Sequence, residues 1–217
     1  MTLPPPVPPA FRSPAWARAA ILGGVVGPAA FIASWGVLGA TRADYEPTRR
    51  YISDLAAIGA PTRPWMTGGL VAFGLGLSVY GVAARAYGHR AIGAFGVLTG
   101  VSSLGVAAFP LGTSSAHGHV AAAAVGYATL VAIPVTGAVL HARSRRYGWA
   151  VVSAAVAVAS ATALVVSTKG SGSYPGLFQR AGLTLSDVWV ATHAIALWRA
   201  HSASCSRSDA SRGFQGV

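Results

Sequence analysis

Long apolar segments alternate with short polar ones along this chain, and charged residues mark the boundaries between them. Uncharged runs of 23, 21, 52 and 22 residues separate successive groups of charges. A transmembrane helix needs about 20 apolar residues to cross a bilayer, so three runs each fit one span and the longest fits two. A further stretch, between Arg180 and Arg199, contains a single charge, Asp187. The pattern predicts an all-α membrane protein, a compact bundle of six transmembrane helices.

These spans divide the chain into three parts. Residues 1–18 are rich in proline and lack the pattern of a signal peptide, so we expect a disordered N-terminal lead. Residues 19–200 form the six-helix transmembrane domain, and residues 201–217 are expected to be a disordered tail rich in serine and arginine. The predicted spans are residues 19–40, 64–84, 91–111, 119–140, 147–168 and 181–198.

The composition agrees with a membrane protein and excludes other classes. Hydrophobic residues make up 53% of the chain and charged residues 10%, against about 25% charged residues in soluble domains. The net charge of +11 is spread beside the spans, which argues against a nucleic-acid partner. Cys205 is the single cysteine, so neither an internal disulfide nor a multi-thiolate metal site can form. We expect no cofactor and no metal; the oligomeric state stays open.

Basic residues predict the orientation in the cell membrane. They divide ten against six between the two sides of the predicted bundle, and the richer side is expected to be cytoplasmic, with both termini. The richer set is Arg12, Arg18, Arg85, Arg90, Arg143, Arg145, Arg146, Arg199, Arg207 and Arg212; the other is Arg42, Arg49, Arg50, Arg63, Lys169 and Arg180. Small residues within the spans, such as Gly93, Gly96 and Gly100, predict close helix packing.

Polar residues gather in the three loops of the predicted outer side. The loop of residues 41–63 holds three of the five acidic residues, Asp44, Glu46 and Asp54. The loops 112–118 and 169–180 supply histidine, serine, tyrosine and arginine. A function at the outer surface of the membrane follows from this distribution.

Three short motifs lie in or beside these loops. The first is Tyr45-Glu46-Pro47 leading to Ile52-Ser53-Asp54-Leu55, and the second is Phe109-Pro110 followed by His117. The third is the Gly-Leu-Phe-Gln-Arg stretch of residues 176–180, followed by Trp189. Together these motifs resemble a bacterial membrane family catalogued as domain of unknown function 998. The resemblance extends over roughly residues 19–200 and implies six spans, but it implies no activity.

The candidate site combines residues from all three loops and the last span. The candidate catalytic residues are Asp54, His117 and Asp187; the candidate substrate-binding residues are Tyr45, Ser53, Arg180 and Trp189. Asp187 is the one charge within a predicted span, and such residues are usually functional. An acid without a full partner in a dry cavity could transfer a proton near neutral pH.

Each of these residues also has a structural interpretation. Ser53 could cap a short helix, and Asp54 could form an ion pair with Arg49, Arg50 or Arg180. Arg180 could extend to the membrane interface or bind an anionic head group. His117 and His119 diverge by about 200° on a helix, which argues against a shared metal ion.

Three functions fit the sequence, and all involve the lipid bilayer. The favoured one is an enzyme that acts on an amphipathic lipid or isoprenoid, by proton-initiated terpenoid cyclisation between aromatic walls. A non-enzymatic accessory subunit or lipid-binding scaffold is the alternative. A membrane lipid hydrolase that uses Ser53, Asp54 and His117 is the second alternative. A transporter fits poorly, because no internal repeat is present.

Overall fold

The computed structural model describes residues 14–112, 114, 116–169 and 174–213, with side chains as far as Ala200. Every regular element in this part of the chain is helical. The elements are α1 (Ala15–Ala20), α2 (Gly23–Thr41), the 3₁₀ helix η1 (Ile52–Ala56), α3 (Arg63–Ala86), α4 (Arg90–Ala108), α5 (Ala116–Arg143), α6 (Tyr147–Thr168) and α7 (Pro175–Gly213).

The predicted all-helical membrane bundle is confirmed. Five segments are long and apolar enough to cross a membrane: residues 15–41, covering α1 and α2, and helices α3, α4, α5 and α6. The sixth predicted span lies in α7, which packs within the bundle but is outside this set of five. Buried polar side chains, Arg180, Asp187 and His193 among them, lie along this helix. The chain is therefore a multi-pass helical membrane protein.

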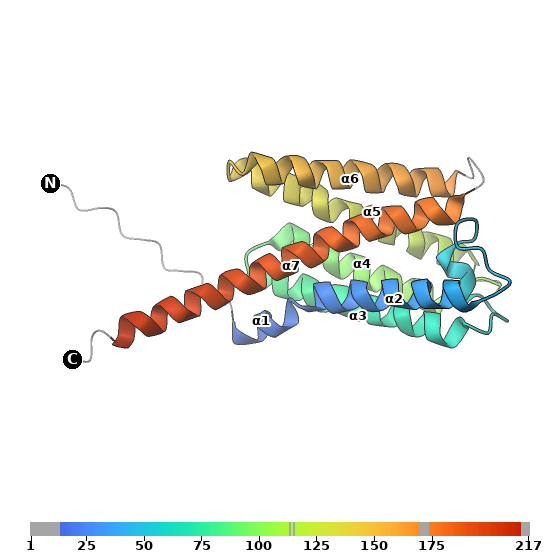
Figure 1. Cartoon of the computed structure of the whole chain (residues 1–217), viewed down its shortest axis with the longest axis horizontal. Coiled ribbons are helices and arrows are strands. Elements are labelled where there is room, and N and C mark those ends of the chain that lie inside the picture. Colours follow the sequence, from blue (N-terminus) through green and yellow to red (C-terminus); the bar gives the residue numbers. More distant parts are fainter. Residues whose placement is uncertain (1–13, 113, 115, 170–173, 214–217) are drawn as a thin grey trace.

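The six long helices form a closed ring. Each of α2 to α6 packs against the next helix in sequence, and α7 packs against both α6 and α2. Figure 1 shows the long helices running roughly side by side, with α7 crossing the bundle obliquely. We call the end with residues 42–62 and the first turn of α7 the loop end, and the opposite end the α1 end. The connections from α3 onward are short, which explains why these successive helices are neighbours in space, whereas α2 and α3 pack together across the longer loop of residues 42–62.

Glycines allow the helices to approach closely, as the small-residue pattern predicts. A Cβ atom on Gly76 in α3 would lie 2.7 Å from Cα of Gly27 and 2.8 Å from the carbonyl oxygen of Gly23, both in α2. A Cβ atom on Gly81 in α3 would lie 2.6 Å from the carbonyl oxygen of Gly93 in α4. Side chains at these positions would force the backbones apart.

The two ends of the chain differ from the predicted domain limits. Helix α1 begins at Ala15, within the predicted lead, and α7 continues to Gly213, through much of the predicted tail. No proline interrupts residues 176–213, and alanine and serine are frequent after Ala200, which is compatible with a continuing helix. Residues 1–13 and 214–217, the rest of the predicted lead and tail, lie outside the described residues.

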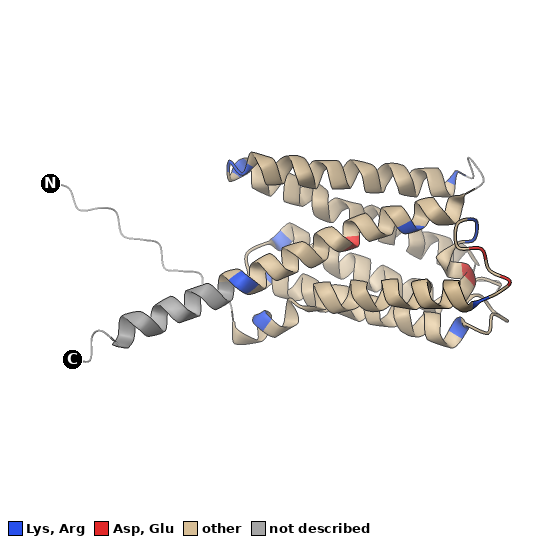
Figure 2. Cartoon of the chain, viewed as in Figure 1, with Lys and Arg blue, Asp and Glu red and all other residues tan. Residues whose placement is uncertain are grey.

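Charge is segregated along the bundle. The three ion pairs among the described side chains all lie in residues 42–62: Arg42–Asp44, Arg49–Glu46 and Arg50–Asp54. Figure 2 shows acidic residues at the loop end and one within α7, with basic residues at both ends. The α1 end thus carries cations without acidic partners among the described side chains.

Candidate functional site

Arg180 in the second turn of α7 organises the loop end. Its side chain is 8% exposed and donates through Nη1 to the carbonyl oxygens of Pro47 and, at 2.9 Å, Arg50. Its Nη2 donates to the hydroxyl oxygen of Tyr45. The guanidinium also lies 5.3 Å from the ring centroid of Trp35. Arg180 therefore holds residues 45–50 against α7 through main-chain carbonyls rather than through a carboxylate.

The beginning of α7 is shaped for this contact. A Cβ atom on Gly176 would collide with the carbonyl oxygens of Pro47 and Arg50, so the absence of a side chain lets the loop lie directly on the helix. The amide nitrogen of Leu177 donates to the carbonyl oxygen of Thr48 at 2.9 Å. One of the free amide groups at this helix end is satisfied in this way.

Gln179, one residue before Arg180, joins the loop to α5. Its Oε1 accepts from the amide nitrogen of Ile52 at 2.8 Å, and its Nε2 donates to the hydroxyl oxygen of Tyr127 at 2.6 Å. The hydroxyl of Tyr51 donates to the carbonyl oxygen of Ser167 at 2.7 Å, which ties the same loop to α6. Helix η1 is thus fixed over the end of the bundle.

Tyr45 is the central side chain of this cluster. Its hydroxyl group donates to the carbonyl oxygen of Tyr51 at 2.8 Å, while it accepts from Arg180. Burial raises the pKa of Tyr45 above its usual value, although the nearby Arg180 charge opposes the shift. Tyr45 is therefore a neutral phenol at physiological pH, and it acts as a fixed link between the loop and α7.

Asp54 is part of an ion pair and is not a free acid. Its Oδ2 lies 3.2 Å from Nε of Arg50, and its side chain is 23% exposed. Of the three arginines predicted as possible ion-pair partners of Asp54, Arg50 makes this contact. In a nearby pair, the half-buried Arg42 donates two hydrogen bonds, of 2.7 and 2.8 Å, to the exposed Asp44. The hydrogen bonds from Arg42 lower the pKa of Asp44.

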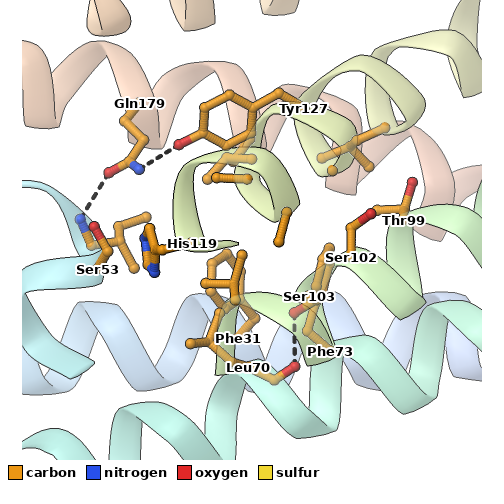
Figure 3. Close-up of a pocket in the computed structure, with 17 residues that line it drawn as sticks. Phe31, Ser53, Leu70, Phe73, Thr99, Ser102, Ser103, His119, Tyr127 and Gln179 are labelled. Atoms are coloured by element: carbon orange, nitrogen blue, oxygen red, sulfur yellow. Dashed lines mark hydrogen bonds between the residues drawn. The ribbon is translucent and has the colours of Figure 1, made fainter. Parts of the chain in front are cut away.

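A cavity of about 90 Å³ lies beneath η1. Figure 3 shows Ser53, His119 and Gln179 toward one side of it and Phe31, Leu70 and Phe73 along another. Most of its lining is apolar. The remaining polar groups are Tyr127, Thr99, Ser102 and Ser103. The last three sit on α4, where Thr99 donates to Thr129 at 2.9 Å and Ser103 donates to the carbonyl oxygen of Leu70 at 2.8 Å.

His119, rather than His117, lines this cavity. Both residues lie in the first turn of α5, where a two-residue step turns the side chains to different faces. His117 is exposed and outside the cavity lining, whereas His119 is 7% exposed. Nδ1 of His119 lies 2.8 Å from the carbonyl oxygen of Phe109, an atom that can only accept, so Nδ1 carries the proton. In the neutral ring, Nε2 is then the basic nitrogen.

Asp187 and Trp189 lie deeper in α7, away from the loop cluster. Asp187 is 1% exposed, and neither carboxylate oxygen has a hydrogen-bond partner among the described residues. It is one helical turn beyond Leu183, which lines the cavity, and therefore shares its face of α7. Trp189 donates to Oγ of Ser153 at 2.9 Å and stacks on His193 at 5.2 Å between ring centroids.

The structure thus brings some predicted residues together and separates others. Tyr45 and Arg180 are in direct contact, and Ser53 lines the cavity. Asp54 is held by Arg50 in the same loop, whereas Trp189 lies elsewhere. No group of three or more histidine, cysteine, aspartate or glutamate side chains among the described residues could hold a metal ion.

Gln179 and Tyr127 were absent from the residues that the sequence singled out. Gln179 belongs to the Gly-Leu-Phe-Gln-Arg motif, and its place beside Arg180 was the available signal. Tyr127 lies in the middle of an apolar span, where a tyrosine is ordinarily a packing residue. Its contact with Gln179 and its place in the cavity lining distinguish it.

Comparisons with known proteins place this architecture within one family. No functionally curated protein and no solved structure matches the chain. A family model, described as a protein of unknown function (DUF998), matches residues 25–196, which include the cavity, the loop of residues 42–62 and the Arg180 cluster. The chain therefore belongs to the DUF998 family.

Proposed function

We propose that this protein binds the polar end of an amphipathic lipid or isoprenoid in the cavity beneath η1 and acts on it there, with His119 as the proton-transferring group. The observation that carries the proposal is the position of His119. Its Nδ1 is fixed by the Phe109 carbonyl, which leaves Nε2 as the basic nitrogen of a side chain on the cavity wall. A general base requires a defined tautomer and access to the substrate.

The cavity lining suits one end of an amphipathic molecule. Phe31, Phe73 and Leu130 form apolar walls inside the bundle, and Ser53 and Tyr127 present hydroxyl groups. Binding sites of this kind are mainly apolar, with a few polar groups that set the orientation. A volume of about 90 Å³ holds a small polar group or a few carbon atoms, so the rest of the lipid would extend outside the cavity.

Ser53 and His119 also support the hydrolase form of the proposal. They line the same cavity, and a serine–histidine pair is a common nucleophile and base. No hydrogen bond joins them in the described structure, so hydrolysis requires the pair to close when a substrate binds. His119 takes the role predicted for His117.

Asp187 supports the cyclase form. Proton-initiated cyclisation needs a dry acid, and Asp187 is almost wholly buried without a described hydrogen-bond partner, whereas Asp54 is already paired with Arg50. A polyprenyl chain is larger than the cavity beneath η1, however. This form therefore requires the helices to separate on substrate entry, which makes chemistry at the polar end the simpler proposal.

The experiment compares two histidine variants from the same helix. His119→Asn keeps a donor near the position of Nδ1 but removes the titratable ring, whereas His117→Asn makes the same change at an exposed position. Purified proteins are incubated with total membrane lipid and isoprenoid extracts, and the products are followed by mass spectrometry. Loss of acid–base assistance lowers rates about 10²–10⁴-fold. We expect this loss for His119→Asn and near-normal turnover for His117→Asn; equal turnover in both variants would reject His119.

A scaffold without enzymatic activity predicts a different result. No product would then form with the unmodified protein, although lipid binding at the cavity would persist. This outcome would reject the catalytic part of the proposal and retain the binding part.

A further inference from the structure

A second and larger cavity opens toward the α1 end, between α5, α6 and α7. Its volume is about 390 Å³, and we call it the α6–α7 groove. Trp149 on α6 and Trp189 on α7 supply aromatic walls, and His141 and Arg146 lie where α5 ends and α6 begins. The groove shares no lining residue with the cavity beneath η1.

The groove has the length of a lipid chain in one leaflet. Its lining residues on α7 run from Thr184 to Ala196, which corresponds to about 18 Å along the helix. Half of the hydrocarbon core of a bilayer is about 15 Å thick. Val152 and Val188, on the two walls, are 50% and 56% exposed. An extended acyl or prenyl chain therefore matches this apolar surface.

The inner wall of the groove is fixed in position. His193 contacts the hydroxyl of Tyr80 through Nδ1 at 2.8 Å and Nδ1 of His89 through Nε2 at 3.2 Å. Its ring stacks on Trp189, which is itself bonded to Ser153. Rings held in this way give a rigid surface, so the groove is preformed rather than dependent on a ligand.

The α1 end of the groove is cationic. Arg146 lines it, and two exposed cations precede it: Arg143 is the last residue of α5, and Arg145 lies in the turn that follows. None of the three pairs with a carboxylate among the described side chains, since the described ion pairs lie at the loop end. Arg145 adopts the left-handed backbone conformation, with φ of 56°, within this turn. The charge therefore complements an anionic group at the membrane surface.

We propose that the α6–α7 groove is a binding site for an anionic membrane lipid. One chain of the lipid lies between α6 and α7, and its phosphate group contacts Arg146 beside His141. The site is separate from the proposed reaction site and lies in the opposite leaflet. It does not depend on what happens beneath η1.

The test measures lipid retention by native mass spectrometry of the full chain in detergent, with phosphatidylglycerol and phosphatidylcholine as probes. A charge at an anionic membrane surface changes affinity about fivefold. We expect preferential retention of one phosphatidylglycerol molecule, and a reduction of about fivefold in Arg146→Gln. The matched control is Arg85→Gln, because Arg85 is a basic residue near the α1 end but lies outside the groove lining.

A second pair of variants tests the position of the chain. Val188→Trp should fill the groove and abolish retention, whereas Val158→Trp, at an exposed α6 position outside the lining, should retain the lipid. Equal retention of the two lipids, unchanged retention in Val188→Trp, or displacement by inorganic phosphate alone would overturn the proposal. A failure here leaves the His119 experiment unaffected, since the two sites share no lining residue.

Discussion

Arg180 and Tyr45 are 135 positions apart in the sequence and are joined by a hydrogen bond inside the loop end of the bundle. This contact, with the two loop carbonyls that Arg180 also binds, fixes residues 45–50 on the first turns of α7. The loop in turn positions η1, which covers the cavity. Arg180 thus acts on the candidate site by holding its cover in place.

The first prediction concerns this contact. Arg180→Met should remove the Arg180 donor from the carbonyl oxygens of Pro47 and Arg50, of which that of Arg50 keeps a longer contact of 3.3 Å with the Tyr45 hydroxyl. We expect the free energy of unfolding to fall by about 2–4 kcal/mol. Tyr45→Phe should have a smaller effect, about 1 kcal/mol, because it removes one hydroxyl group. Thermal unfolding in detergent measures both changes. Wild-type stability of Arg180→Met would show that the cluster contributes little to holding the loop.

The second prediction concerns helix packing. Gly76→Ala should lower stability by about 1–3 kcal/mol, because the added methyl group overlaps the backbone of Gly27 and Gly23. Gly36→Ala in α2 is the matched control, since its Cβ atom would meet nothing within 4 Å. The control should be neutral or stabilised by up to about 1 kcal/mol. The same melting experiment compares the two, and equal effects would contradict the close α2–α3 contact.

The third prediction concerns pH. Burial lowers the pKa of His89, in the connection between α3 and α4, below its usual value of 6.5, and the neighbouring His141 adds to the shift. Below about pH 6.5 the unfolded chain therefore binds more protons than the folded chain, so stability falls as the pH decreases. His89→Asn should remove the contribution of His89 and make the decline between about pH 6.5 and pH 5 less steep. An equally steep decline in the variant would assign the effect to other groups.

The fourth prediction concerns orientation, which rests on the distribution of arginine and lysine. Reporter fusions after Arg90 and after Arg146 should be cytoplasmic, and a fusion after Ser173 should be external. The reverse pattern would invert the bundle and move the proposed reaction site to the cytoplasmic leaflet. The internal geometry of both cavities would not change.

The sequence predicted the helices well because charge is costly inside a bilayer. The predicted span 147–168 coincides with α6, and the other spans overlap their helices closely, except that α7 extends well beyond residues 181–198 at both ends. Asp187, the one charge predicted to lie within a span, is 1% exposed inside the bundle. The side-chain contacts were harder to predict. Arg180 binds main-chain carbonyls, and a carbonyl leaves no signature in the sequence.

His117 and His119 show a second limit of the sequence. Their divergence on a helix was predictable, but the face that points inward depends on where α5 begins. The predicted span begins at residue 119, whereas α5 begins at Ala116. With both histidines in the first turn, the packing of α5 on α4 decides which of them is buried.

The most direct measurement of the central claim, a lipid in the cavity beneath η1, is photo-crosslinking from two valines of α4. Val106 lines the cavity, whereas Val101 lies outside it and is 56% exposed. A photoreactive residue is placed at either position in membranes, and the adducts are identified by mass spectrometry. We predict that position 106 captures one selected lipid or isoprenoid and that position 101 captures lipids in their bulk proportions. The same adducts at both positions, or none at position 106, would contradict the account.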